Sequence, residues 1–160
     1  MIEAASTLTT DKAVKLFEKF GIFTKVELES REEIIYETYA KTINIEALTM
    51  SETVLNASRL MKKYNVGSIP VIDESSQVVG IITDRDIVVR VFADILPMNT
   101  KVSEVMTHPV HTIIETAEVG EAISLMADKQ VRRLPVVDNN SKLVGMISLG
   151  DLAIHQLSRF

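Results

Sequence analysis

Two short apolar runs separated by a polar turn mark the most informative stretch of the chain. Residues Gly67–Ile87 read GSIPVIDESSQVVGIITDRDI, in which Gly80 interrupts the second run. Apolar runs of this length bounded by turn residues predict the two strands of a hairpin. Thr83 follows at the position of a helix N-cap, and Asp84 and Asp86 follow in the first turn, where carboxylates suit the helix dipole. We therefore expect the second strand to lead directly into a helix.

The stretch before this hairpin has a helical period. Apolar or aromatic side chains recur there at i, i+3, i+7 and i+10, and they are Val54, Ala57, Met61 and Tyr64. We expect Ser51 to cap this helix and Ala47–Thr49 to form a short strand before it. The helix that starts at Asp84 is expected to end near Asp94, before Pro97. The predicted order of elements is β-α-β-β-α.

The same pattern occurs a second time. Residues Arg132–Leu152 read RRLPVVDNNSKLVGMISLGDL, and they follow their matches in the first copy at one constant offset. The matched pairs are Val54 with Val119, Ala57 with Ala122, Leu60 with Leu125, Met61 with Met126, Pro70 with Pro135, Asp73 with Asp138, Gly80 with Gly145 and Asp86 with Asp151. A constant offset through a helix, two strands and a turn indicates a duplicated unit. Residues 96–101 read as the linker, and Val110–Ile114 as the first strand of the second copy.

Residues 1–45 do not belong to the repeat. Apolar positions such as Val14, Phe17 and Phe20 predict a short helix that Gly21 ends, and Thr24 precedes a longer amphipathic pattern. We expect a helical extension that packs on the repeats or takes part in dimerisation.

Composition excludes several classes of function. The net charge of −5 disfavours a surface for nucleic acid or anionic membranes. The chain has no cysteine, so it has no disulfide framework and no thiol chemistry. No apolar run approaches the roughly 18 residues of a membrane span, and the N-terminus lacks a basic leader pattern. We expect a cytoplasmic protein.

Two hydroxyl–carboxylate pairs are the candidate chemistry. Thr83 with Asp86, and Ser148 with Asp151, each stand three residues apart across a helix start. An ionised Asp is an acceptor that can take both vicinal hydroxyls of a ribose, and the N–H groups of a helix start favour phosphate. Neither standard phosphate-binding loop is present. No catalytic residues are expected, and no metal site either, because the three histidines have no partner at metal-ligand spacing.

The doubled motif h-P-V-h-D, turn, h-V-G-h-h-[ST]-x-x-D closely resembles the CBS domain, and two copies resemble a CBS pair, or Bateman module. The resemblance implies two repeats packed as a pseudo-twofold pair, at residues 46–96 and 97–160. It implies an adenosine ligand (AMP, ADP, ATP or S-adenosylmethionine) in the cleft between the repeats, and no required cofactor. The implied ligand-binding residues are Thr83, Asp86, Thr112, Ile113, Arg133, Leu134, Pro135, Ser148 and Asp151.

By this resemblance, the second repeat has the fuller set of ligand residues. Thr112 matches the h-x-T-h motif of the first strand, and Arg133 matches a position that often contacts phosphate. The first repeat has Ala47 and Ser68 at the corresponding positions. We therefore expect the second repeat to bind more tightly.

A second resemblance concerns the N-terminal segment. Residues Leu8–Met50, with the run ELESR…Y…TINIEALTM, are similar to a stretch near the C-terminus of type III glutamine synthetases. The resemblance implies helices outside the catalytic pocket, since the metal-binding and ATP-binding parts of that enzyme have no counterpart here.

These observations favour a non-catalytic, regulatory sensor of adenine nucleotides that signals to an effector protein. One alternative is a structural or interaction module without nucleotide. A further alternative is an enzyme related to glutamine synthetase. We also expect a homodimer through apolar helix faces, formed by Ile87, Val88, Val91, Leu152, Ile154 and Leu157.

Overall fold

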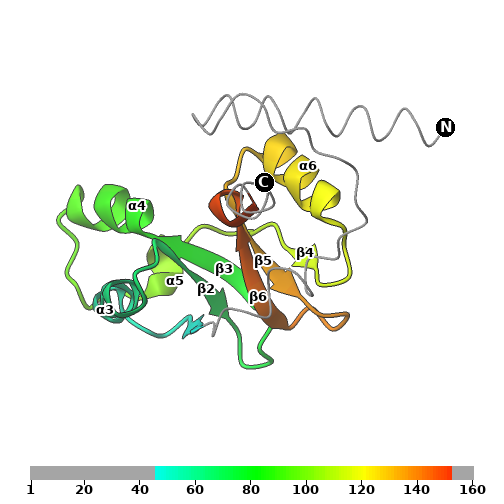
Figure 1. The fold of residues 1–160 in the computed structure, drawn as a ribbon. Coiled ribbons are helices and arrows are strands. Elements are labelled where there is room, and N and C mark those ends of the chain that lie inside the picture. Colours follow the sequence, from blue (N-terminus) through cyan, green and yellow to red (C-terminus); the bar gives the residue numbers. More distant parts are fainter. Residues whose placement is uncertain (1–45, 153–160) are drawn as a thin grey trace. The chain divides into compact units, whose positions relative to one another are not determined.

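The structure is a computed structural model that describes residues 46–152 (Figure 1). The predicted helical extension of residues 1–45, and Ile154 and Leu157, lie outside the described residues. The elements are β1 (Leu48–Thr49), α3 (Val54–Tyr64), β2 (Ser68–Ile72), β3 (Val78–Thr83), α4 (Asp84–Asp86), η2 (Ile87–Phe92), α5 (Val102–Val105), β4 (Ile113–Ile114), α6 (Val119–Lys129), β5 (Arg133–Val137) and β6 (Leu143–Ser148).

The strands form two three-stranded sheets, in the orders β1-β2-β3 and β4-β5-β6. In the first sheet β1 pairs parallel with β2, and β2 pairs antiparallel with β3 from Ser68 opposite Thr83 onward. The mixed α/β class is confirmed, and both copies have the predicted order β-α-β-β; the final helix expected in the second copy lies largely outside the described residues. The predicted strand Val110–Ile114 is reduced to the two residues of β4, because the residues before Ile113 make no ladder.

Helix α3 begins later than predicted. Its N-cap is Thr53, which has extended backbone angles and whose hydroxyl accepts the N–H of Asn56 at 3.2 Å. The prediction of Ser51 as the cap is wrong, since its hydroxyl instead lies 3.2 Å from that of Thr49. The helix ends with Asn65 in the left-handed conformation, at φ 53°, a position that asparagine tolerates better than most residues.

The helix after β3 changes its winding. Thr83 caps α4 as predicted, and α4 continues without a break into η2, a π-helix. Bonds between residues five apart define this winding, as in the Ala93 N–H to the Val88 carbonyl at 3.0 Å. Val91 is only 1 % exposed there, so its placement on an exposed face was wrong. Val88 on the same segment is 59 % exposed.

The predicted linker packs against the start of α3. The N–H groups of Val54 and Leu55 donate to the carbonyls of Thr100 at 2.9 Å and Met98 at 3.0 Å. These are donors that a helix start leaves without intrahelical partners. The linker therefore caps α3, and α5 follows directly at Val102.

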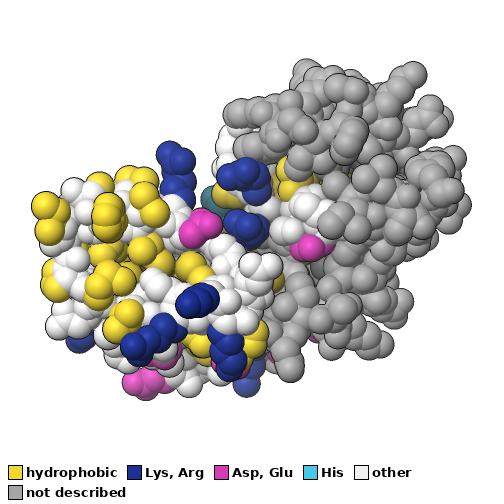
Figure 2. Space-filling view, turned by 60° about the vertical axis from the view of Figure 1, so that its left-hand side comes forward, with side chains coloured by type: hydrophobic (Ala, Val, Ile, Leu, Met, Phe, Trp, Pro, Cys, Tyr) yellow, Lys and Arg dark blue, Asp and Glu magenta, His cyan; other side chains and the backbone are white. Residues whose placement is uncertain are grey.

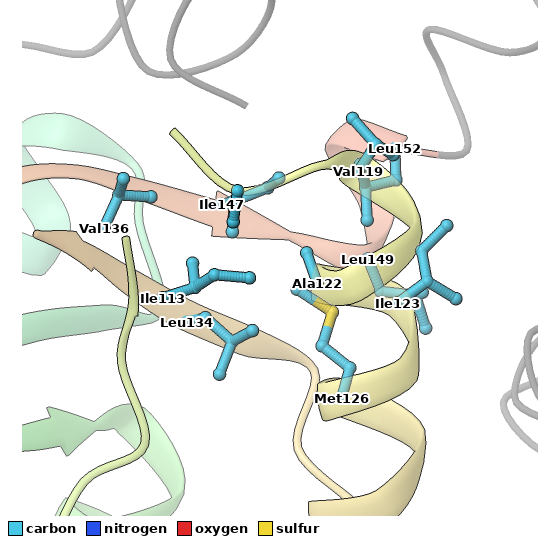
Figure 3. Close-up of a cluster of buried hydrophobic side chains, with 11 residues drawn as sticks. Ile113, Val119, Ala122, Ile123, Met126, Leu134, Val136, Ile147, Leu149 and Leu152 are labelled. Carbon is cyan, nitrogen blue, oxygen red and sulfur yellow. The ribbon is translucent and has the colours of Figure 1, made fainter. Parts of the chain in front are cut away.

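Each sheet has its own hydrophobic core. Figure 3 shows the second core, whose side chains fill the space between α6 and strands β5 and β6. Leu152 belongs to it and is 1 % exposed, so its predicted exposure was also wrong. The first core is formed by Leu48, Val54, Ala57, Met61, Ile69, Val71, Ile82, Val91, Val102, Val105 and Met106.

Contacts divide the described residues into two compact units, 46–112 with 137–143, and 113–136 with 144–152. Within the first unit the two hairpin turns lie side by side. The Leu143 N–H donates to the Ser76 carbonyl at 3.2 Å, and Gln77 forms an antiparallel bridge with Lys142.

An aspartate organises the turn of the second hairpin. Asp138 Oδ1 accepts the backbone N–H groups of Asn140 at 2.8 Å and Lys142 at 2.9 Å. These donors, the Lys142 N–H first, hold the pKa of Asp138 below its ordinary value of 3.8. Asp73 makes the same two contacts in the first hairpin, to the N–H groups of Ser75 and Gln77.

Candidate ligand site

The first hydroxyl–carboxylate pair forms a capping box at the start of α4. The Thr83 hydroxyl donates to Asp86 Oδ2 at 2.7 Å, and the Thr83 N–H donates to the same oxygen at 2.9 Å. In return, the Asp86 N–H donates to the Thr83 hydroxyl at 3.1 Å. This reciprocal arrangement satisfies donors of the helix start locally.

The second pair repeats this geometry at the end of β6. The Ser148 hydroxyl and N–H donate to Asp151 Oδ2 at 2.6 and 2.9 Å, and the Asp151 N–H donates to the Ser148 hydroxyl at 3.2 Å. The two pairs therefore have the same internal hydrogen bonds, as expected for a duplicated unit.

The two carboxylates differ in what their second oxygen contacts. Asp86 Oδ1 accepts the Thr107 hydroxyl at 3.2 Å and lies 3.4 Å from the Nη1 of Arg90. Asp86 is 7 % exposed. Asp151 is exposed, and no hydrogen bond from a described residue to its Oδ1 is found in residues 46–152. Within the described chain, only the second pair offers a carboxylate oxygen to a ligand.

Sequence reasoning missed Arg90 and Thr107 as neighbours of the first pair. Arg90 stands four residues after Asp86, a spacing that brings side chains together on one helix face, so this contact was readable. Thr107 lies 21 residues away in sequence, and no local pattern indicates its contact.

The start of β5 lies next to the second pair. The Leu149 N–H donates to the Arg132 carbonyl at 2.9 Å, as the Asp84 N–H donates to the Gly67 carbonyl at 3.0 Å in the first repeat. This bond joins the beginning of β5 to the helix start that carries Ser148. Arg133, the first residue of β5, is exposed.

The other predicted site residues lie deeper or elsewhere. Leu134 and Pro135 are buried in β5, and the Leu134 side chain belongs to the second core. Ile113 is 7 % exposed and packs in the same core, so only its main chain is available to a ligand. Thr112 is half-buried and belongs to the first unit.

Two other kinds of site are absent from residues 46–152. No group of three His, Asp or Glu side chains that could hold a metal ion occurs in this part of the chain. Nor does this part contain a helix of the length and apolarity that crossing a bilayer requires.

The fold and the two capped helix starts define a tandem-repeat α/β module with one hydroxyl–carboxylate pair in each repeat. The chain belongs to the CBS domain family, whose model matches residues 40–92 and 102–157, and it contains a tandem CBS pair. A second family model, the glutamine synthetase C-terminal domain, matches residues 1–62.

Among curated proteins, the chain is similar to the CBS domain-containing protein YhcV of Bacillus subtilis (strain 168), with 42 % identity over 117 residues. That match covers 73 % of this chain and 82 % of YhcV. Among solved structures, CBSX2 in complex with AMP has 26 % identity and a TM-score of 0.63 and covers 72 % of this chain and 90 % of that one.

A further solved structure is the CBS domain pair of protein MJ0100 in complex with 5-methylthioadenosine and S-adenosyl-L-methionine. It has 28 % identity and a TM-score of 0.61, and the match covers 71 % of this chain and 92 % of that chain. Both complexes contain adenosine compounds.

Proposed function

We propose that this chain is a non-catalytic regulatory module that binds an adenosine-containing ligand, AMP, ADP, ATP or S-adenosylmethionine, through its second repeat. The observation that carries the proposal is the exposed carboxylate of Asp151, whose Oδ1 has no partner among the described residues. Similar CBS pairs in complex with AMP and with S-adenosyl-L-methionine support the ligand class.

Each polar group of the second repeat has a chemical task in this proposal. Asp151 Oδ1 accepts hydrogen bonds from ribose hydroxyls, because an ionised carboxylate is an acceptor only. The guanidinium of Arg133 pairs with phosphate, for which its planar donor geometry is suited. Ser148 fixes Asp151 through the 2.6 Å bond to Oδ2 and leaves Oδ1 for the ligand. Base contacts by Thr112, Ile113, Leu134 and Pro135 stay predictions.

The regulatory role has a thermodynamic limit. A ligand transmits a signal only as far as it binds one conformation of the module more tightly than another. The proposal therefore requires a ligand whose affinity changes when the effector protein is bound.

The second candidate function is an interaction module that binds no nucleotide. It is favoured by a group of exposed apolar side chains on η2 and on the residues after it. Phe92 is 80 % exposed and Ile95 is 89 % exposed, with Val88 and Val89 at 59 % and 51 %. Figure 2, whose view brings the side of α3 and α4 forward, shows hydrophobic side chains gathered there. We propose that a second copy of the chain covers these side chains. The chain would then be a homodimer whether or not it also binds nucleotide.

The N-terminal segment is proposed to add no catalysis. Its match to the glutamine synthetase C-terminal domain covers residues 1–62 and overlaps the first CBS match. A glutamine-formation assay with ATP, glutamate and ammonia tests this, and turnover by the purified chain would reject the non-enzymatic assignment.

The test of the sensor function is calorimetric titration with adenosine, AMP, ADP, ATP and S-adenosylmethionine. Asp151→Ala is expected to remove most binding. A hydrogen bond to a charged group contributes roughly 1.5–3 kcal/mol, so Arg133→Ala should weaken ATP about tenfold to a hundredfold and adenosine little. Arg132→Ala removes the same charge one position earlier and is the matched control. No heat and no retained nucleotide with any of the five compounds would reject the proposal.

A further inference from the structure

We infer, resting on the proposed function, that Arg90 and Thr107 close the first hydroxyl–carboxylate pair to ribose. The chain then binds one adenosine ligand, at the second repeat. "Closed" here means that both oxygens of Asp86 already accept hydrogen bonds from the protein itself.

Both oxygens of the Asp86 carboxylate have partners within the protein. Oδ2 accepts the hydroxyl and the N–H of Thr83, whereas Oδ1 accepts the Thr107 hydroxyl and forms an ion pair with the Arg90 guanidinium at 3.4 Å. The residue is 7 % exposed. A ribose would have to displace Thr107 and Arg90 together to reach Oδ1.

Thr107 cannot move aside at small cost. Its N–H donates to the Ile81 carbonyl at 2.8 Å, and its carbonyl accepts the Ile81 N–H at 3.1 Å, which makes an antiparallel bridge to β3. The Thr107 hydroxyl is therefore held beside Asp86 by backbone hydrogen bonds as well as by its own contact.

The guanidinium of Arg90 has two partners, the Asp86 carboxylate and a backbone carbonyl. The Nη1 that faces Asp86 also donates to the carbonyl of Val105 at 2.8 Å, at the end of α5. Displacing Arg90 would leave that carbonyl without this donor and would also remove the ion pair. The position that matches Arg90 in the second copy holds His155, which lies outside the described residues.

In this arrangement, Arg90 and Thr107 determine how many adenosine ligands one chain binds. Asp86 then acts as an internal acceptor that joins α4, η2 and the segment at Thr107, whereas Asp151 binds the ligand. The two pairs have the same local hydrogen bonds, and among the described residues Arg90 and Thr107 are neighbours that only the first carboxylate contacts.

Equilibrium dialysis with adenosine, which counts ligand bound per chain, tests the inference. The wild type should bind one adenosine, and Asp151→Ala none. The double variant Arg90→Met/Thr107→Val keeps the aliphatic stem and the β-branched shape but frees Oδ1, and it should bind two. Adding Asp151→Ala to the double variant should reduce the count to one. Far-ultraviolet circular dichroism checks that each variant is folded.

Three results would overturn the inference. A wild type that binds two adenosines, or an Asp151→Ala variant that still binds one, shows that the first pair is open, and neither measurement depends on a change near Asp86. A folded double variant that binds only one shows that Arg90 and Thr107 do not close the pair. If neither the wild type nor the double variant binds any of adenosine, AMP, ADP, ATP and S-adenosylmethionine, the proposed function itself fails.

Discussion

Removing the two equivalent aspartates should have very different effects on stability. Asp86→Ala and Asp151→Ala delete the same group from the same capping geometry, at matching positions of the two copies. Asp86 is 7 % exposed and has partners on both oxygens, whereas Asp151 is exposed. Comparing the two variants therefore isolates the effect of the burial of Asp86 and of its extra contacts on stability.

The contacts set the expected magnitudes. Asp86→Ala leaves the Thr83 N–H and the Thr107 hydroxyl without their acceptor, and it removes the ion pair of Arg90, which keeps its bond to the Val105 carbonyl. A buried donor left unsatisfied costs roughly 1–3 kcal/mol, while the side chain of Arg90 is 45 % exposed and water compensates much of its loss. We expect a loss of about 2–5 kcal/mol in the free energy of unfolding, because the Thr83 N–H and the Thr107 hydroxyl are both left without an acceptor.

Asp151→Ala removes a capping carboxylate at the surface. Loss of a cap costs about 0.5–2 kcal/mol, typically near 1. Set against about 1 kcal/mol for a typical cap, Asp151 should therefore contribute about 1–4 kcal/mol less than Asp86.

Urea denaturation followed by far-ultraviolet circular dichroism measures both values without ligand. Asp86→Asn, which keeps the shape and one acceptor oxygen, should fall between the wild type and Asp86→Ala. If Asp86→Ala costs no more than Asp151→Ala, the internal contacts of Asp86 do not stabilise the fold. The reasoning about closure of the first pair would then be wrong as well.

Three further outcomes are expected. Gly80→Ala should lower the free energy of unfolding by about 1–3 kcal/mol, because the new Cβ would lie 2.5 Å from the Sδ of Met106. Urea denaturation should show a smaller loss when the same change is made in Met106→Ala, and equal losses would contradict the clash. The lowered pKa of Asp138 stabilises the fold above pH 3.8, and this contribution is lost as the pH falls through the lower pKa of the folded state. Asp138→Asn should lose this part of the pH dependence of stability, and an acid unfolding transition identical to that of the wild type would contradict the contribution of Asp138. Phe92→Ser with Ile95→Ser should convert the dimer to monomer in light scattering, and a monomeric wild type at micromolar concentration would exclude the dimer.

The parts of the fold that depend on local pattern could be predicted from the sequence. Both hairpins, the Thr83 cap and the repeated order of elements follow from apolar runs and turn residues within about ten positions. The cap of α3 was predicted at Ser51 and lies at Thr53; both residue types are good N-caps, and pattern alone does not choose between hydroxyl residues two positions apart. The linker carbonyls that take the first N–H groups of α3 favour the later start.

The sequence predicted less well which helix faces are buried and which residues far apart in the chain are in contact. In a regular α-helix Val91 would share a face with Ile87 and Val88, whereas η2 has bonds between residues five apart and buries Val91 while Val88 is exposed. The candidate pairs Thr83–Asp86 and Ser148–Asp151 were identified as motifs, but the difference between them depends on Thr107. Contacts across 21 residues arise from tertiary packing, and a single sequence carries no signal for them.

The packing of the linker has a consequence for separating the two copies of the duplicated unit. The segment that is repeated in the sequence is not the segment that forms a core, since Val102, Val105 and Met106 lie after the first copy and complete its core. The first copy alone would lack these three core side chains, and α3 would lose the linker carbonyls that accept its first N–H groups. The first copy therefore depends on the segment that joins it to the second, and the two copies could not be separated at residue 96 without loss to the first core.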